Sequence, residues 1–477
     1  MKCFKYILFI VLFINTFYAS APDTLWTKTY SGIPPTSTDY GRCVRQTDDG
    51  GFIIAGYHTW SGGAGLWLLK TDINGDTTWT LKKEPGDGYE MQQTKDKGYI
   101  VVGAGLLKVD SCGNISWVKR FDYSWFGTGR SVQQTLDGGF IIAGDTRYSD
   151  EKSHDICLIK TDENGNTTWT RTYGGSSVER GFAVQQLSDN GYMVIGYTAF
   201  YPKSFDIWLI RTDDQGDTLW TKNYGGFEIE HGKAGQQTSD GGFIILGETT
   251  SYSAGRYDIW LVKTDAKGDT LWTRTYGGTG QERAWDVHQT FDGGYIIAAS
   301  TESYGVGNSD AWIIKTDAQG DTLWTKVMGG TDYDLIYSVR QTWDGGYILT
   351  GHKAAPYKMG PGGDLWLIRL APDTVTSIAK NEQSMPKEFT LHQNYPNPFN
   401  HSTTIEYEIF KDARVILKIV DLKGREVKTI VNEYQTTGKY SLSWDGTVNG
   451  INQPSGVYFY QIETGVLKQT KKMLFLK

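Results

Sequence analysis

Cysteine is scarce in this sequence, and the four residues present are Cys3, Cys43, Cys112 and Cys157. Cys3 lies in an N-terminal segment that we expect to be removed, so an odd number of thiols remains. The other three occupy different positions of the repeat described below. This pattern favours neither a disulfide framework nor a metal cluster. We therefore predict no metal site and no cofactor.

Runs of basic residues and the common catalytic motifs are also missing. The formal net charge is -7, and no cluster of Lys or Arg offers a surface for nucleic acid or an anionic membrane. The chain contains no GxSxG, no HExxH and no Gly-Lys phosphate loop, and its seven histidines occupy no repeated position. Apolar residues nowhere keep a helical period after the N-terminus, so an α-helical fold is not indicated.

The one long apolar run stands at the N-terminus. Lys2 and Lys5 precede apolar residues 6–18, and "ASA" at 19–21 offers the small residues that a signal peptidase needs. The run is too short to span a bilayer with margin, and no later stretch could do so. We predict a signal peptide over residues 1–21, and an exported chain without a transmembrane segment.

What the sequence does have is an internal repeat. The phrase "TDAKGDTLWTRTYGG" at 264–278 recurs in close variants, with successive tryptophans 53, 38, 52, 51, 52 and 52 residues apart. Self-similarity at such a period indicates stacked or radially repeated units. The 58 glycines and 14% aromatic residues suit short strands joined by tight turns. The tryptophans that count the copies are Trp26, Trp79, Trp117, Trp169, Trp220, Trp272 and Trp324.

Each repeat divides into four short runs at turn signals. In residues 284–328 the runs are "AWDVHQT", "GYIIAAS", "DAWIIKTD" and "DTLWTKV", which we name strands a, b, c and d. Four such runs with Gly or Asn at the junctions predict an antiparallel meander, the blade of a β-propeller. The repeat region begins with a lone strand d at 23–30 and ends with a strand c at 364–370.

A ring explains both ends of the repeat. If residues 23–30 complete the last blade beside residues 364–370, no sheet edge is left open. We therefore predict an all-β chain in which residues 22–370 form a seven-bladed β-propeller closed by the N-terminal strand. The alternative, a linear stack of seven sheets, would leave that strand without a partner.

The repeated phrases themselves are best explained as turn chemistry. The a-to-b and c-to-d turns keep constant lengths, and their "DGG" and "TDxxGD" residues suit Asp accepting amide hydrogen bonds and Gly adopting positive φ. The alternative is calcium binding by carboxylates such as Asp265 and Asp269, although so short a turn offers few converging oxygens. The repeated tryptophan is expected to lie buried between neighbouring blades.

The a-to-b and c-to-d turns share one rim of the propeller. The d-to-a and b-to-c connections share the opposite rim, where their lengths vary, and this rim carries the candidate ligand site. Blade two collapses to "VVGAGLLKVD", so its b-to-c loop should leave a notch in the rim. Aromatic and charged residues flank this notch, and they suit stacking on a sugar or contact with a partner protein. The alternative is that these rings cap the blade ends. The candidate ligand residues are Trp60, Tyr89, Glu90, Tyr123, Trp125, Phe126 and Arg130.

Charged residues also recur on this rim, among them Asp39, Glu179, Glu282 and Asp334. We interpret them as solvated loop ion pairs. A pair of carboxylates facing the centre could instead cleave a glycosidic bond. The leading interpretation is thus a protein that binds a glycan or protein ligand, and the alternative is a polysaccharide-cleaving enzyme.

The repeat "LVKTDAKGDTLWTRTYGG" resembles the tryptophan-bearing repeat of quinoprotein-like propellers, and no catalytic residue carries over from that resemblance. After a polar linker at 371–386, ordered motifs fill residues 387–477. They are "NYPNPFN" at 394–400, "DLKGREV" at 421–427, "WDG" at 444–446 and "SGVY" at 455–458.

This last span resembles the type A C-terminal sorting domain of the type IX secretion system. Its alternating strands and tight turns indicate a small Ig-like β-sandwich. The resemblance implies that the secretion machinery is a partner and that the protein is secreted or displayed on the outer cell surface. The residues that would carry the sorting motif are Asn394, Tyr395, Pro396, Asn397, Pro398, Phe399, Asn400, Gly456 and Lys472.

Overall fold

A computed structural model gives the structure of the chain, which forms two compact units, residues 1–376 and 377–477. The expected signal peptide lies outside the described residues as far as residue 19. Among the residues described, no helix has the length and apolar character of a membrane span. The structure describes residues 20–31, 38–60, 63–84, 86–121, 126–146, 154–200, 204–354, 363–373, 389–392, 394–409, 412–421, 425–448, 450–464 and 467–475.

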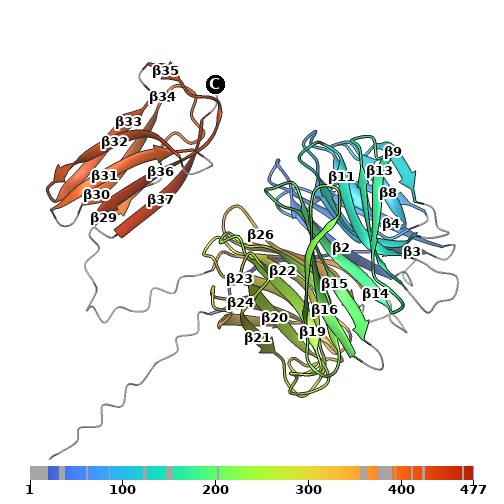
Figure 1. Ribbon diagram of the computed structural model, residues 1–477. Helices are drawn as coiled ribbons and strands as arrows, with labels where there is room; N and C mark the ends of the chain where they lie inside the picture. Colours follow the sequence, from blue (N-terminus) through green and yellow to red (C-terminus); the bar gives the residue numbers. More distant parts are fainter. Residues whose placement is uncertain are drawn as a thin grey trace, which may run out of the picture. The chain divides into compact units, whose positions relative to one another are not determined.

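Four-stranded antiparallel sheets make up the first unit (Figure 1). The first sheet contains β2 (Asp39–Gln46), β3 (Phe52–Trp60), β4 (Gly63–Thr71) and β5 (Thr77–Lys83). The second contains β6 (Glu90–Gln93), β7 (Tyr99–Val102), β8 (Gly105–Val109) and β9 (Ile115–Arg120). The third contains β10 (Phe126–Gln134), β11 (Phe140–Thr146), β12 (Ile156–Thr161) and β13 (Thr167–Tyr173).

The same order of strands continues along the chain. The fourth sheet contains β14 (Glu179–Gln186), β15 (Tyr192–Phe200), β16 (Ser204–Thr212) and β17 (Thr218–Tyr224). The fifth contains β18 (Glu230–Gln237), β19 (Phe243–Thr249), β20 (Asp258–Thr264) and β21 (Thr270–Tyr276). The sixth contains β22 (Glu282–Gln289), β23 (Tyr295–Thr301), β24 (Asp310–Thr316) and β25 (Thr322–Met328). The predicted a–b–c–d meander is confirmed.

The last sheet of this unit joins the two ends of the repeat region. It contains β26 (Leu335–Gln341), β27 (Tyr347–Ala354), β28 (Gly363–Leu370) and β1 (Thr24–Tyr30). Strand β1 runs antiparallel to β28, with Thr27 opposite Ile368. The predicted pairing of the N-terminal strand with the last strand c is therefore confirmed.

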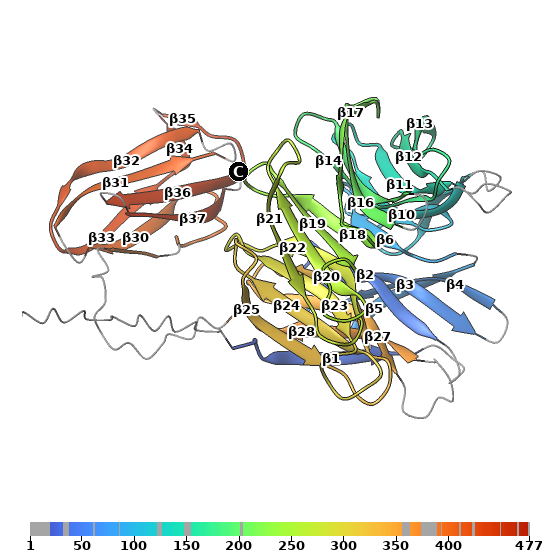
Figure 2. The same ribbon diagram turned by 60° about the horizontal axis from the view of Figure 1, so that its bottom comes forward.

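Neighbouring sheets are linked by the glutamine that ends most of the first strands. The side chain of Gln341 accepts a hydrogen bond of 2.8 Å from the backbone N–H of Phe291 in the preceding sheet. Gln46 of the first sheet accepts one of 3.0 Å from Trp343 of the last. The first strands also contact one another in succession, including β26 with β2, and Figure 2 shows β2, β6, β10 and β18 toward the middle of the unit. This succession of radially packed four-stranded sheets is a β-propeller fold.

The repeated Asp and Gly residues form the turns, as predicted. In the turn between β20 and β21, one carboxylate oxygen of Asp265 accepts the N–H groups of Lys267 and Asp269, at 2.8 and 2.9 Å. Gly268 in the same turn has a φ of +78°, which glycine adopts without strain. The carboxylate is thus occupied by turn amides, which supports turn formation rather than calcium binding.

A buried cation under each a-to-b turn was not anticipated from the sequence. The ammonium of Lys315, whose side chain is fully buried, lies 2.8 Å from the carboxylate of Asp292 in the "DGG" turn. The same pair occurs in each four-stranded sheet that the structure describes in this unit. The pairs are Lys70–Asp49, Lys108–Asp96, Lys160–Asp137, Arg211–Asp189, Lys263–Asp240, Lys315–Asp292 and Arg369–Asp344.

The repeated tryptophan packs at the junction of two sheets, as expected, but most of its copies are not fully buried. Trp272 of β21 is half-buried and lies against Gly320 in the turn of the next sheet. Trp324 is an exception, with 3% of its surface exposed. The rings therefore seal the outer edge of the contact between sheets, while aliphatic residues of the b and c strands fill its centre.

The second unit is a β-sandwich. One sheet contains β29 (Phe389–Leu391), β30 (Thr403–Ile409) and β33 (Gly438–Trp444). The other contains β32 (Glu426–Gln435), β31 (Ala413–Val420), β36 (Gly456–Thr464) and β37 (Leu467–Phe475), and a short ribbon pairs β34 (Thr447–Val448) with β35 (Ile451–Asn452). Alternate residues of both sheets, such as Ile405, Leu417 and Tyr460, share one core.

The first residues of the expected linker contact the first unit. Ala371 donates its N–H to the carbonyl of Asp23 at 2.9 Å, and Asp373 accepts a hydrogen bond of 2.8 Å from the indole of Trp324. Residues 371–373 therefore pack against the first unit. Residues 374–388 lie outside the described residues.

Candidate functional site

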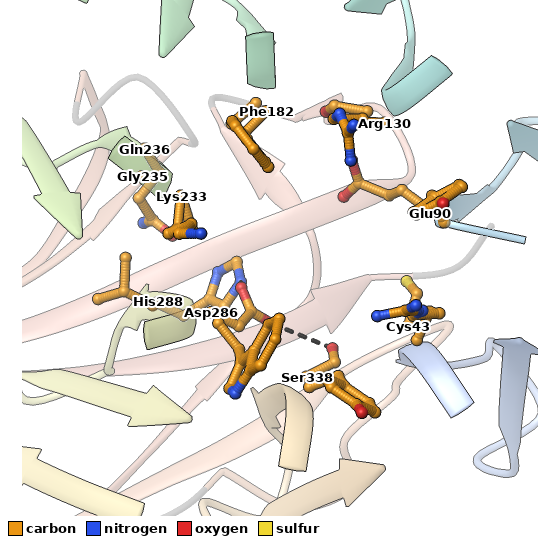
Figure 3. A pocket seen from close by; sticks show the side chains of 18 of the residues that line it. Cys43, Glu90, Arg130, Phe182, Lys233, Gly235, Gln236, Asp286, His288 and Ser338 are labelled. Atoms are coloured by element: carbon orange, nitrogen blue, oxygen red, sulfur yellow. Dashed lines mark hydrogen bonds and ion pairs between the residues drawn. The ribbon is translucent and has the colours of Figure 1, made fainter. Parts of the chain in front are cut away.

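A cavity of about 400 Å³ lies among the first strands of the seven sheets. Its lining comes from β2, β6, β10, β14, β18, β22 and β26, together with Tyr89 just before β6. Figure 3 shows side chains from several of these strands, among them Arg130, Phe182, Lys233 and Asp286, around one open space. Because each sheet contributes its innermost strand, the cavity is part of the central channel of the unit.

Seven of the lining residues occupy the same place in the repeat, four residues before the glutamine that ends each first strand. We call this set the collar. Unlike the turns, the collar differs in chemistry from sheet to sheet, with three cationic and four aromatic side chains. Its members, in chain order, are Arg42, Tyr89, Arg130, Phe182, Lys233, Trp285 and Tyr337.

A β-bulge places most collar residues. Along β2, Gly41 lies opposite Gly56 and Cys43 lies opposite Ala55, so Arg42 between them has no partner on β3. The same irregularity occurs in β10, β14, β18, β22 and β26. An extra residue in one strand bends that strand and redirects a side chain. The bulge is therefore the local cause of a ring of side chains that line the cavity.

The cations and rings of the collar contact one another. The guanidinium of Arg130 lies 4.8 Å from the ring centroid of Phe182 and 5.7 Å from that of Tyr89. The ammonium of Lys233 lies 5.3 Å from the centroid of the same Phe182 ring. Such cation–π contacts hold both groups in place when water is partly excluded. The rings of Trp285 and Tyr337 meet edge to face at 4.8 Å.

Carboxylates behind the collar neutralise two of its three cations. The Nε of Arg130 lies 2.9 Å from the carboxylate of Asp145. The ammonium of Lys233 lies 3.5 Å from Glu248, which is fully buried and is also 3.1 Å from Arg283. Burial lowers the pKa of Lys233, and Glu248 opposes that effect. Two cations thus share the Glu248 carboxylate.

A second group of charges lies next to the collar. The carboxylate of Asp286 accepts hydrogen bonds from Ser338 Oγ at 3.0 Å and from the Val339 N–H at 3.1 Å, and it pairs with Arg340. His288 Nε2 lies 3.0 Å from the same carboxylate. Burial alone would raise the pKa of Asp286, but Arg340 and His288 outweigh it and lower the pKa. Asp286 is therefore held as an anion.

The histidine of this group is held neutral. Burial, followed by repulsion from Arg340, lowers the pKa of His288 to about 4. The Ser338 hydroxyl donates to Asp286 rather than to an imidazole, so the arrangement is not that of an activated serine nucleophile. Glu90, the other carboxylate of the cavity, lies 2.8 Å from Arg45.

Three of the ligand residues expected from the sequence line this cavity, namely Tyr89, Glu90 and Arg130. Phe126, another candidate ligand residue, is not exposed. Its ring is fully buried at the start of β10 and packs on Phe121 at 4.8 Å, because the strand begins there and turns the ring inward. Tyr123 and Trp125 lie outside the described residues, and of Trp60 only the backbone, at the end of β3, is described.

Four of the rim carboxylates are buried rather than solvated, contrary to expectation, whereas Asp332 is exposed. Asp39 and Glu282 have no exposed surface, and Glu179 and Asp334 expose 3% each. Glu282 accepts hydrogen bonds from Thr301 Oγ1 at 2.8 Å and from the Gly278 N–H at 3.2 Å. These carboxylates tie the loops to the ends of the strands.

The collar could have been recognised in the sequence by aligning the repeats on their glutamine. Four positions earlier, the otherwise uniform copies carry Arg, Tyr, Arg, Phe, Lys, Trp and Tyr. When one position varies between repeats that are otherwise nearly identical, that position is a candidate for ligand binding. Phe182, Lys233, Trp285 and Tyr337 were missed because the variable loops drew attention to the rim instead.

The motif residues of the second unit combine buried anchors with exposed positions. Phe399 is buried, stacks on Phe475 at 4.9 Å and donates its N–H to the carbonyl of Leu474. The amide of Asn397 bonds the backbone of Lys472 and Leu474 in β37, and Asn394 bonds Thr403 Oγ1 at 2.7 Å. The exposed members are Tyr395, Pro396, Asn397, Pro398, Asn400 and Lys472.

Known proteins resemble the chain only distantly in structure. A fungal alcohol oxidase in complex with copper shares 10% identity at a TM-score of 0.48, over 95% of this chain and 99% of that one. The Dos1 propeller shares 12% identity at a TM-score of 0.43, over 73% and 96% of the two chains. Sqt1 from Chaetomium thermophilum shares 10% identity at a TM-score of 0.42, over 80% and 97%.

No curated protein matches the chain in sequence. Likenesses this weak do not bear on what the protein binds or does, so its function has to be inferred from its own residues. The C-terminal unit is different, because the match there is to a family and includes every expected motif residue. Residues 393–476 match the family described as the secretion system C-terminal sorting domain, which indicates type IX-dependent secretion to the cell surface or the extracellular space.

Proposed function

We propose that the protein is a secreted or surface-displayed seven-bladed β-propeller, formed by residues 22–370 and closed by β1, that binds a glycan in its central channel. The C-terminal Ig-like sandwich, residues 387–477, acts as its export signal. The observation that carries the proposal is the collar, in which rings and cations from seven strands line one cavity. The ligand site is thus moved from the loops of the rim to the channel.

The size and lining of the cavity favour a saccharide over a folded partner protein. Sites for small molecules commonly occupy ~300–1,000 Å³, and this cavity falls near the lower end of that range. Aromatic faces such as those of Tyr89 and Trp285 suit the apolar face of a sugar ring, while Arg and Gln side chains suit its hydroxyl groups. A protein partner would need a broad surface rather than an enclosed channel.

Binding without chemistry is better supported than cleavage. Glycoside hydrolysis needs a carboxylic acid that stays protonated to donate to the leaving group. Asp286 is held ionised by Arg340 and His288, as its lowered pKa indicates. Glu90 bonds Arg45 and the N–H of Val132. Both carboxylates of the cavity therefore serve to fix neighbouring side chains.

A pair of tryptophan variants of the mature chain tests this site. Trp285→Ala removes a ring of the collar, whereas Trp343→Ala removes a ring that is 60% exposed on the a-to-b turn of the last sheet and does not line the cavity. We expect Trp285→Ala to weaken binding to a glycan array by about tenfold or more. Trp343→Ala should bind like the wild type.

Thermal unfolding of both variants checks that they are folded. The proposal is wrong if folded Trp285→Ala binds glycans as well as the wild type, or if the wild type binds no member of the array. Release of sugars from a polysaccharide by the wild type, lost in Asp286→Asn, would favour the enzymatic alternative.

A further inference from the structure

The cavity carries an excess of positive charge in a chain that is negative overall. Five cationic side chains line it, namely Arg42, Arg45, Arg130, Lys233 and Arg340, against the two carboxylates of Glu90 and Asp286. The chain as a whole has a formal net charge of -7. Cationic side chains gathered around one cavity favour an anionic ligand wherever carboxylates of the fold do not neutralise them.

Most of these cations already have a carboxylate partner. Arg45 lies 2.8 Å from Glu90, and Arg340 pairs with Asp286. Arg130 and Lys233 are neutralised from behind by Asp145 and Glu248. These four side chains are therefore fixed by the fold and contribute mainly to the shape of the cavity.

Arg42 differs from the other four. Within the residues that the structure describes, it has no ion pair within 4.0 Å, and its Nε is buried without a hydrogen-bond partner. Asp87 interacts with it electrostatically but hydrogen bonds to Tyr89. A buried guanidinium nitrogen without an acceptor loses a hydrogen bond that it would make in water, unless a ligand supplies the acceptor.

Three aromatic rings hold the Arg42 guanidinium in position. Its central carbon lies 4.7 Å from the ring centroid of Tyr40, 4.9 Å from that of Tyr337 and 5.5 Å from that of Tyr89. Contacts with ring faces use the π electrons and give the guanidinium N–H groups no lone-pair acceptor. Those N–H groups match the two oxygens of a carboxylate or sulfate.

We infer that the glycan bound in the channel is acidic, and that Arg42 determines this specificity by pairing with the carboxylate or sulfate of a sugar whose ring stacks on the collar. This inference rests on the proposed function and specifies the class of its ligand. Tyr89 and Tyr337 are the collar rings that contact the Arg42 guanidinium, and they would be the stacking surfaces for that sugar.

Calorimetric titration of the mature full-length chain tests the inference with three probes of equal length. They are an oligogalacturonate, a sulfated galacto-oligosaccharide and the neutral galacto-oligosaccharide. We expect at least one acidic probe to bind about tenfold or more tightly than the neutral one, with an affinity that falls as salt rises. Which acidic probe binds identifies the anion as carboxylate or sulfate.

Variants of Arg42 separate charge from packing. Arg42→Gln should abolish the preference for the acidic probe, so that the acidic and neutral probes bind this variant with affinities within about twofold of each other, and Arg42→Lys should restore part of the preference. The matched control is Arg171→Gln, which removes an arginine on the outer strand β13 that pairs with Asp217 at 3.0 Å. That variant should bind like the wild type.

The outcomes distinguish the two levels of the proposal. Equal binding of acidic and neutral probes, with loss of both in Trp285→Ala, would overturn the inference and leave the glycan site standing. A preference for acidic probes that survives in Arg42→Gln would overturn the role of Arg42. Failure of the wild type to bind any probe or any glycan of the array would overturn both.

Discussion

The indole of Trp272 lies directly over the Cα of Gly320 in the next sheet, so that a Cβ added to Gly320 would be 2.7 Å from the ring. The hydroxyl of Tyr276 donates to the carbonyl of the same glycine at 2.6 Å. The turn therefore requires glycine at this place of the "TDxxGD" phrase for two reasons. The backbone has a positive φ, and the tryptophan of the preceding sheet leaves no room for a Cβ. This contact explains why the two halves of the repeated phrase recur together.

Gly320→Ala should destabilise the protein through both requirements. Gly320 has a φ of +79°, and Gly293 has a φ of +84° but no neighbour within 4 Å of an added Cβ. We expect Gly293→Ala to cost ~1 kcal/mol from backbone strain alone, and Gly320→Ala to cost ~2–4 kcal/mol because the indole must also move. Chemical denaturation of both variants measures the difference. Equal losses would show that the tryptophan contact is adaptable.

The buried Lys315–Asp292 pair should respond differently to loss of each partner. Asp292→Ala leaves a fully buried ammonium without its anion and also removes the acceptor of the Gly294 N–H. Removing one partner of a buried pair commonly costs ~3–5 kcal/mol, and we expect the lower end of that range because Asp292 is 53% exposed. Lys315→Met leaves only a solvated carboxylate and should cost less than half as much. The reverse order in equilibrium unfolding would contradict this assignment.

Closure by β1 can be tested by removing it. A chain that lacks residues 20–30 loses the ladder to β28 and the contact of Trp26 with Phe52, whose ring centroids are 6.0 Å apart. The exposed edge of β28 should lower the melting temperature markedly and favour association between molecules. Differential scanning calorimetry and light scattering report the two effects. A truncated protein that melts like the intact one and stays monomeric would support the linear stack over the ring.

Stability should depend on pH through a buried pair of carboxyl groups. Oδ1 of Asp258 and Oε2 of Glu282 both lie against Gly277, where an added Cβ would meet them at 2.3 and 2.8 Å. Burial, reinforced by the Glu282 charge, raises the pKa of Asp258 above its usual 3.8. The folded state therefore binds this proton more tightly than the unfolded state. Its contribution to stability is complete below pH 3.8 and is lost as pH rises through the raised pKa.

Asp258→Asn supplies a permanent N–H donor at this site. We expect the variant to lose less stability than the wild type between about pH 4 and pH 7, and to exceed it by ~1 kcal/mol at pH 7. Urea unfolding across this range measures both. Asp332→Asn, which removes an exposed charge, is the control and should follow the wild type. If the stability of the wild type and of Asp258→Asn changes with pH in parallel, the raised pKa of Asp258 is excluded as the cause.

Local sequence determined the strands, the turns and their order in the first unit. Glycine at positive φ and aspartate as an acceptor act over a few residues, so "TDAKGD" forms the same turn wherever it stands. The surplus strand at 23–30 and the missing one after residue 370 predicted the pairing of β1 with β28, because an open sheet edge is unfavourable. The motifs after residue 390 likewise predicted the sorting domain from order and spacing alone.

The tertiary structure decided which side chains meet in the channel. Arg42 and Tyr337 come from opposite ends of the repeat region, and they lie together because the last sheet packs against the first. The alternation of residues along β2 also could not predict the β-bulge at Arg42. The bulge arises in the pairing of β2 with β3, and it redirects the Arg42 side chain. Phe126 stands among other aromatic residues in the sequence, but the structure places its ring in the buried core. The physical reason is that strand patterns specify local geometry, whereas the lining of a channel depends on how distant strands converge about an axis.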